Sequence, residues 1–152
     1  GEHDGKILRA FDEKMWSHHL GTKLVNNVQL NKQSIAIEIC NYGPIKLVNG
    51  KYINYVGGEV KADAVYTLAQ PWRGYTIYEE YTDKQIESLK LLLIYLRDTY
   101  GIHITKKWTA ANFEIDQNAV IGLPGLYVHA NCRSDKFDLS PSPKMMAMLN
   151  TL

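Results

Sequence analysis

Residues 125–138 carry the side chains of this sequence that are best suited to chemistry. They offer an imidazole at His129 and a carboxylate at Asp138, nine positions apart, with the ammonium group of Lys136 between them. Imidazole nitrogen and carboxylate oxygen both bind zinc, and a cation beside an open coordination position suits hydrolysis. The alternative is a histidine bonded to backbone, followed by a charged loop in which Asp138 only forms a turn.

A second group of motifs lies upstream. Residues 16–21 are Trp-Ser-His-His-Leu-Gly, and residues 31–41 are Asn-Lys-Gln-Ser-Ile-Ala-Ile-Glu-Ile-Cys-Asn. Together with the C-terminal segment, these motifs resemble the zinc-dependent N-acetylmuramoyl-L-alanine amidases, whose fold is shared by phage lysozyme-type amidases and the peptidoglycan recognition proteins. The matching positions keep the family's order over nearly the whole chain: Asp4-Gly5, His19-Leu20-Gly21, Asn31 to Glu38, Gln85, His129 and Lys136-Phe137-Asp138.

The resemblance implies Zn2+ as cofactor, with His129 and Asp138 as two of three protein ligands. In the family the first ligand is a histidine on a strand that precedes the Asp-Gly hairpin. Only three residues precede Asp4 here, and His3 matches no ligand position. We therefore expect the third ligand, a histidine, upstream of Gly1 in an N-terminally truncated domain; otherwise the site is incomplete. Cys132 lies too close to His129 in sequence to match that third position.

The same motifs suggest catalytic and substrate-binding roles. Glu38 is the candidate general base, because a carboxylate facing a metal site can accept a proton from bound water. Lys136 is the candidate that stabilises the oxyanion. The resemblance places His19, Asn31 and Trp16 at positions that contact the muramyl peptide. The alternatives are a structural carboxylate at Glu38, a solvated charge at Lys136, and packing or turn-capping roles for Trp16 and Asn31.

Two functions remain open at this stage. The first is a peptidoglycan hydrolase of endolysin type, which cleaves the amide bond between N-acetylmuramic acid and the L-alanine of the stem peptide. The second is a non-catalytic muropeptide-binding module with an incomplete zinc site. The first zinc-binding histidine distinguishes the two functions, because the hydrolase needs it and the binding module lacks it. In both cases the expected partner is peptidoglycan, and an endolysin would be cytoplasmic before its release to the cell wall.

Composition excludes some other classes of partner. The 17 Lys and Arg residues nearly balance the 16 Asp and Glu residues, so the net charge gives no reason to expect binding to nucleic acid or to an anionic membrane. No apolar run approaches the ~20 residues needed to span a bilayer, and no signal peptide is visible at Gly1. Cys40 and Cys132 lack C-x-x-C spacing, so we expect free thiols.

Hydrophobic periodicity predicts the elements that position these residues. Residues 6–11 follow Asp4-Gly5 as the return strand of a hairpin, and the alternating isoleucines of residues 34–40 predict a buried central strand with Glu38 on the face of small residues. Residues 42–81 predict an inserted hairpin and loop region. A capping box at Thr82 and Gln85 predicts a helix over residues 82–100.

Residues 125–129 are expected to form a short strand that carries His129, and residues 144–149 a final helix. With 45% hydrophobic residues, the chain can bury one sizeable core, which predicts a single domain over residues 1–152. The expected fold class is mixed α/β, an amidase-like central mixed β-sheet flanked by helices, with the site in a groove at the strand ends.

Overall fold

The computed structural model describes residues 3–12, 14–23 and 26–152. The α-helices found there are α1 (Asn27–Lys32), α2 (Asp83–Tyr100), α3 (Gln117–Ile121) and α4 (Pro143–Leu149). Short 3-10 helices are η1 (Ala62–Ala64), η2 (Ala110–Phe113) and η3 (His129–Asn131). The strands are β1 (Lys46–Val48), β2 (Lys51–Ile53), β3 (Glu59–Val60), β4 (Val65–Trp72) and β5 (Tyr75–Glu79).

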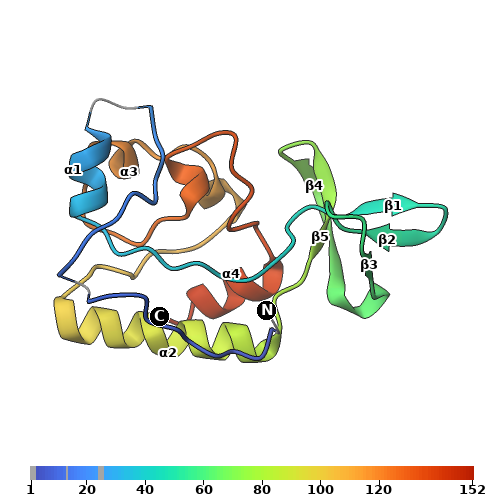
Figure 1. Ribbon diagram of the computed structural model, residues 1–152, viewed down its shortest axis with the longest axis horizontal. Coiled ribbons are helices and arrows are strands. Elements are labelled where there is room, and N and C mark those ends of the chain that lie inside the picture. Colours follow the sequence, from blue (N-terminus) through green and yellow to red (C-terminus); the bar gives the residue numbers. More distant parts are fainter. Residues whose placement is uncertain (1–2, 13, 24–25) are drawn as a thin grey trace.

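Helix α2 is the longest element and lies along one edge of the molecule (Figure 1). The Thr82 side chain accepts a hydrogen bond from the backbone of Gln85, and the Gln85 side chain accepts one from the backbone of Thr82. Gly101 ends the helix in the left-handed conformation, with φ of 65°, which glycine adopts without steric cost. The capping box and the stop signal predicted from the sequence are both confirmed.

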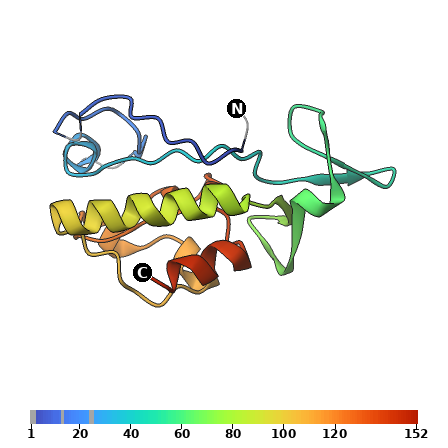
Figure 2. The ribbon, with the colours of Figure 1, turned by 90° about the horizontal axis from the view of Figure 1, so that it is seen from below.

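The hydrophobic core lies between α2 and the C-terminal third of the chain. Ile86, Leu89 and Leu93 on the inner face of α2 join a cluster that includes the fully buried Phe113 and Met145. Figure 2 shows α2 in the middle, with α4 and the C-terminal loops on one side and the segments before β1 on the other. The apolar face of α2 is therefore covered mainly by segments that follow it in sequence.

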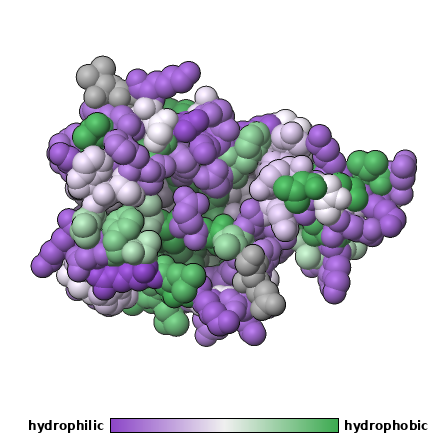
Figure 3. All heavy atoms as spheres, in the orientation of Figure 1, coloured by the Kyte–Doolittle hydropathy of each residue, from purple (hydrophilic) through white to green (hydrophobic). Residues whose placement is uncertain are grey.

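Two small antiparallel sheets form an arm beside this body (Figure 1). One has the order β1-β2-β3, and the other is the β4-β5 hairpin, in which Val65 pairs with Glu79 and Trp72 with Tyr75. Figure 3 shows hydrophobic surface at the outer end of the arm. The exposed large hydrophobic residues of the first sheet and its turns include Leu47, Val48, Tyr55 and Val56. The chain is thus mixed α/β, as the sequence predicted.

The central strand is where the structure differs from the prediction. Residues 34–40 form no β-ladder with any described segment, and neither do residues 6–11 or 125–128. The predicted alternation is nevertheless present, because Ile37 and Ile39 pack against the core while Glu38 is exposed. Apolar periodicity sets which side of an extended segment is buried, but a sheet also requires a neighbouring strand with free backbone groups. The sheets that do form are antiparallel rather than mixed.

None of the helices in the described ranges combines the length and hydropathy that a membrane-crossing segment needs.

Candidate active site

A large pocket of about 770 Å³ opens between the segment before β1 and the helical body. It is lined by residues 32–39, by the C-terminal half of α2 and by residues 122–129. Four of the residues singled out from the sequence reach it: His19, Glu38, His129 and Asp138. Most of the remaining lining is aliphatic or aromatic. A concave, mainly apolar site with a few convergent polar groups is typical of ligand pockets.

His129 and Asp138 meet directly in this pocket. The Nδ1 atom of His129 lies 2.9 Å from Oδ2 of Asp138, and its Nε2 atom lies 2.7 Å from the carbonyl oxygen of Leu20. Both partners are acceptors, so both ring nitrogens donate and the imidazole carries a positive charge. The hydrogen bond that His129 donates to Asp138 is the main cause that raises the pKa of His129 above 6.5, and the same bond lowers the pKa of Asp138 below 3.8.

This ion pair predicts a defined dependence of stability on pH. The contribution of His129, whose pKa is raised, is complete below 6.5 and is lost as the pH rises through the raised pKa. The contribution of Asp138, whose pKa is lowered, is complete above 3.8 and is lost as the pH falls through the lowered pKa. The pair therefore stabilises the fold most between pH 3.8 and 6.5.

We expect Asp138→Asn to lower the free energy of unfolding by about 1 kcal/mol at about pH 5.5, and by less at about pH 9, since half-exposed pairs are weak. Urea unfolding in the presence of a chelator measures both values. An equal loss at the two pH values would show that the pair is not charged in the folded protein.

Asn31 holds the turn that supplies the carbonyl of Leu20. The Oδ1 atom of Asn31 accepts hydrogen bonds from the backbone N–H groups of His19 and Leu20 at 2.8 and 3.0 Å. Its Nδ2 atom donates to the backbone oxygen of Asn27 at 2.7 Å. The side chain is fully buried. Asn31 thus holds the His19–Leu20 turn, which matches the turn-capping alternative from the sequence, and the substrate contact that the resemblance suggested stays a prediction.

Removing the amide of Asn31 would leave the partly buried N–H groups of His19 and Leu20 without their acceptor. We expect Asn31→Ala to lower the free energy of unfolding by about 2 kcal/mol, because each orphaned group costs about 1 kcal/mol when it is only partly buried. Chemical denaturation measures this loss. Gln29→Ala is the control, since Gln29 is an exposed residue of the same helix, and it should change stability by less than about 0.5 kcal/mol. A similar loss in both variants would contradict this role for Asn31.

His19 reaches the pocket from the same turn. Its Nε2 atom lies 2.8 Å from Oγ of Ser34, and its Nδ1 atom lies 2.9 Å from the carbonyl oxygen of Ser17. The hydroxyl of Ser34 in turn donates to the carbonyl of Leu30 at 2.7 Å. The ring is thus held between the turn and the end of α1, at the edge of the pocket that also contains His129.

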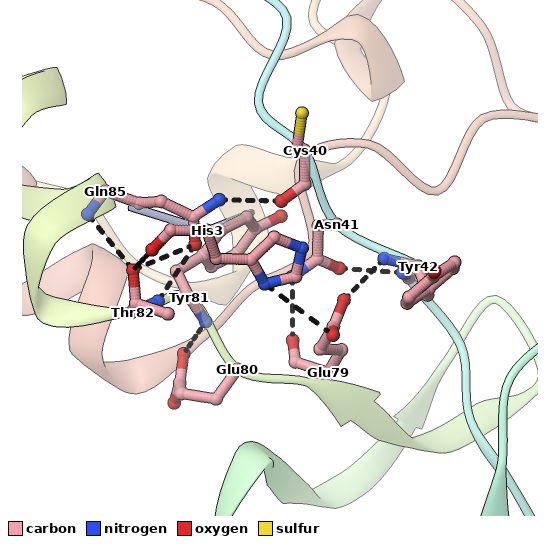
Figure 4. A network of polar contacts seen from close by, with 10 residues as sticks. His3, Cys40, Asn41, Tyr42, Glu79, Glu80, Tyr81, Thr82 and Gln85 are labelled. Atoms are coloured by element: carbon pink, nitrogen blue, oxygen red, sulfur yellow. Dashed lines mark hydrogen bonds and ion pairs between the residues drawn. The ribbon is translucent and has the colours of Figure 1, made fainter. Parts of the chain in front are cut away.

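Glu38 is exposed and lines the same pocket, from the extended segment that leads to β1. The end of this segment is fixed by α2, because the Nε2 atom of Gln85 donates to the carbonyl oxygen of Cys40 at 2.7 Å (Figure 4). Gln85, which completes the capping box of α2, therefore also anchors the extended segment that carries Glu38. The exposed position differs from the buried strand carboxylate that the sequence predicted.

The residues after Cys40 are held by further hydrogen bonds (Figure 4). The buried carboxylate of Glu79, at the end of β5, accepts a hydrogen bond from the backbone N–H of Tyr42 at 2.6 Å, and Asn41 donates to the backbone oxygen of Glu79 at 3.3 Å. The hydroxyl of Thr82 donates to the backbone oxygen of His3 at 2.8 Å. The start of the described chain, the segment before β1 and α2 thus meet at one polar junction.

Lys136 and Trp16 lie outside the pocket lining. Lys136 is half-buried, and its charge acts on His129 and Asp138 as a minor influence on the pKa of each, after their mutual hydrogen bond. The ring of Trp16 is 42% exposed and stacks edge-on against His18, with Lys32 over its face. Trp16 is therefore placed to pack on the surface of α1 rather than inside the pocket.

The donors in the pocket fit zinc in type. Zinc-binding histidines usually donate their second ring N–H to a backbone carbonyl or carboxylate, as His129 does to Leu20. Nδ1 is then the ring nitrogen that could bind a metal, but only after it gives up its proton and its hydrogen bond to Asp138. Within residues 3–12, 14–23 and 26–152, no three His, Cys, Asp or Glu side chains gather closely enough to hold an ion. A tetrahedral zinc site needs more donors than the pair of His129 and Asp138 that the described residues bring together.

Cys132 lines the pocket too, and burial raises the pKa of its thiol, which disfavours the thiolate that metals bind. Cys40 and Cys132 are both free cysteines, as predicted.

Sequence reasoning did not identify two groups that fix this site, the carbonyl of Leu20 and the side chain of Arg73 on the β4-β5 turn. A backbone carbonyl leaves no sequence signal. Arg73 does leave a weak one, since an arginine before Gly74 stands between two aromatic residues at the tip of a predicted hairpin.

The fold is that of a mixed α/β domain, and its pocket contains a histidine–carboxylate pair. Residues 2–138 match the family model of N-acetylmuramoyl-L-alanine amidase, and the chain belongs to this family. Its members are peptidoglycan amidases, so the family supports hydrolase activity with peptidoglycan as the substrate. Comparisons with curated proteins and with solved structures found no match.

Proposed function

We propose that this protein is a zinc-dependent, endolysin-like amidase that cleaves the bond between N-acetylmuramic acid and the L-alanine of the stem peptide. The observation that carries the proposal is the meeting of His129 and Asp138 in a pocket that Glu38 also lines. His129 and Asp138 act as two zinc ligands. The third, a histidine in the pattern that this sequence resembles, lies outside the described residues.

A bound zinc ion supplies a polarised carbonyl and a water molecule of lowered pKa. The carbonyl of Leu20 holds the proton on Nε2 of His129, which orients Nδ1 of the ring toward Asp138. Asn31 keeps that carbonyl in place through the backbone of the His19–Leu20 turn. His129 is thus oriented by groups that do not themselves bind the metal.

Glu38 accepts the proton from the attacking water and later returns it to the departing amine of L-alanine. Its exposed carboxylate can do so because the segment that bears it is anchored at Cys40 by Gln85. Lys136 stabilises the negative charge that develops on the carbonyl oxygen. His19, at the pocket edge, binds the muramyl peptide.

The second candidate function is a non-catalytic muropeptide-binding module. It is favoured by the number of metal donors, since no third donor joins His129 and Asp138 in the described part of the chain. In that case the pocket would bind the stem peptide and leave its amide bond intact.

Digestion of purified peptidoglycan separates the two functions. The amidase is expected to release stem peptides with a free N-terminal L-alanine, detected by mass spectrometry, and a chelator should stop the release. Zinc added back should restore it. Retention of the protein on insoluble peptidoglycan without any release of peptides, with zinc present, would support the binding module instead.

A further inference from the structure

The turn of the β4-β5 hairpin docks on the loop that carries the proposed site residues. Arg73 lies in this turn, and its side chain is only 9% exposed. Its guanidinium donates to the carbonyl oxygen of Arg133 at 3.0 Å and to that of Ala130 at 3.2 Å. These two carbonyls belong to η3 and the residues just after it, immediately beyond His129. One side chain thus ties the start of the loop to a hairpin nearly sixty positions away in sequence.

Aromatic contacts hold the other end of the same loop. Phe137, between Lys136 and Asp138, meets the rings of Trp72 and Tyr75 edge-on, with centroid distances of 6.4 and 5.6 Å. Such edge-to-face pairs contribute about 0.5–1.5 kcal/mol each beyond the area they bury. Trp72 and Tyr75, which flank the turn, therefore pack against the loop next to Asp138.

The backbone conformation at Arg73 is one that arginine rarely adopts. Arg73 has φ of 49° and Gly74 has φ of 83°, the positive values of a tight hairpin turn. A residue other than glycine, asparagine or aspartate is rare at such a φ and costs on the order of 1 kcal/mol. An asparagine would suit the turn better. The side chain of Arg73 offsets that cost through its contacts with the loop.

The guanidinium of Arg73 also contacts Trp72 and Glu114. The plane of Arg73 lies over the ring of Trp72, 4.9 Å from its centroid. Trp72 donates from Nε1 to Glu114 at 2.8 Å, and the second carboxylate oxygen of Glu114 lies 3.9 Å from Arg73. A planar group with several fixed donors can serve two carbonyls and a carboxylate at once, which a lysine ammonium at this distance cannot reproduce.

We propose that Arg73 is a positioning residue for the loop of residues 129–138, so that the β4-β5 turn sets the placement of His129, Lys136 and Asp138. The catalytic part of this inference rests on the proposed amidase function. The structural part does not, because a binding module would depend on the same loop. Arg73 itself touches neither the pocket nor the substrate.

The variant that tests this inference is Arg73→Asn, which fits the turn and removes the guanidinium. Hydrogen–deuterium exchange is expected to become at least about tenfold faster at the protected amides of residues 129–138, while exchange in α2 and in β4-β5 stays unchanged. Turnover of peptidoglycan is expected to fall by roughly tenfold or more with little change in KM, because misplaced groups lower the rate of the chemical step. Arg73→Lys should recover part of both effects.

Arg97→Met is the matched control. Arg97 also reaches a backbone carbonyl, that of Leu152, but lies on α2 away from the loop. Its replacement should leave exchange in residues 129–138 and turnover unchanged. Unchanged loop exchange in Arg73→Asn would overturn the inference, and so would an equal increase in α2, which would indicate general destabilisation. If Arg73→Asn fails to fold, Tyr75→Leu tests the same docking from the aromatic side. An absence of amidase activity in a protein that carries the third zinc ligand would refute the proposed function, while the exchange result would still decide the role of Arg73.

Discussion

Replacing Glu38 by glutamine is expected to lower the turnover of peptidoglycan by roughly 10²-fold or more, the usual contribution of a general base. Glutamine keeps the size and hydrogen-bonding shape of the side chain but cannot accept the proton of the attacking water. Because Glu38 is exposed and supports no packing, the fold and the zinc content should not change. Single-turnover release of stem peptides measures the rate, and metal analysis measures the zinc.

Glu87→Gln provides the control for this experiment. Glu87 is an exposed glutamate on α2 outside the pocket, so its neutralisation changes net charge equally and should leave turnover within about twofold. Near-normal cleavage by Glu38→Gln would exclude Glu38 as the base. A loss in Glu87→Gln of the same size would show that charge on the whole protein, rather than the proton acceptor, governs the rate.

The helical part of the fold follows from local chemistry and could be predicted. Thr82, Gln85 and Gly101 determine where α2 begins and ends, and each acts through groups within a few residues in sequence. The same locality explains why His129 and Asp138 were identified together, since one loop of ten residues carries both. Their direct contact in the pocket agrees with that prediction, while their role as ligands stays a proposal.

The sheet could not be predicted in the same way. Ile37 and Ile39 face the core as the alternation predicted, whereas Ile35 is exposed. A ladder also depends on a partner strand, whose position is not encoded in the segment itself. The strands formed instead in residues 46–79, where turns with Asn49, Gly50 and Gly74 bring neighbouring segments back on themselves. Short-range turns are visible in a sequence, and long-range pairings are not.

The supporting residues of the site were hidden for the same reason. Asn31 acts across twelve positions on the His19–Leu20 turn, and Arg73 acts across some sixty positions on the loop after His129. For Asn31 the sequence offered a substrate contact, with turn-capping as the alternative, and for Arg73 it gave no role. What distinguishes them in the structure is burial combined with hydrogen bonds to backbone, which places them as positioning residues.

Replacing His129 by alanine is expected to lower the affinity for zinc by roughly 10²-fold or more and to abolish cleavage of peptidoglycan. The loss of affinity should exceed the 10–100-fold effect of changing a group that merely orients a ligand. The reason is that His129→Ala removes a group that binds the metal directly, together with its contact to Asp138. The 152-residue chain itself should bind zinc weakly, since the described residues supply two donors where a closed tetrahedral site needs more. Titration with zinc against a competing chelator measures both affinities.

His103→Ala is the control, because His103 is exposed and lies outside the pocket that contains His129. Its zinc affinity should equal that of the unchanged protein. The comparison also separates the two candidate functions. If the protein is an amidase, His129→Ala loses zinc and cleavage together. If it is a binding module, the unchanged protein shows no cleavage, and His129→Ala is still retained on peptidoglycan. Tight, stoichiometric zinc that His129→Ala leaves unaffected would exclude His129 as a ligand, and the direct ion pair with Asp138 would then be a structural feature that holds residues 129–138 against the Leu20 turn.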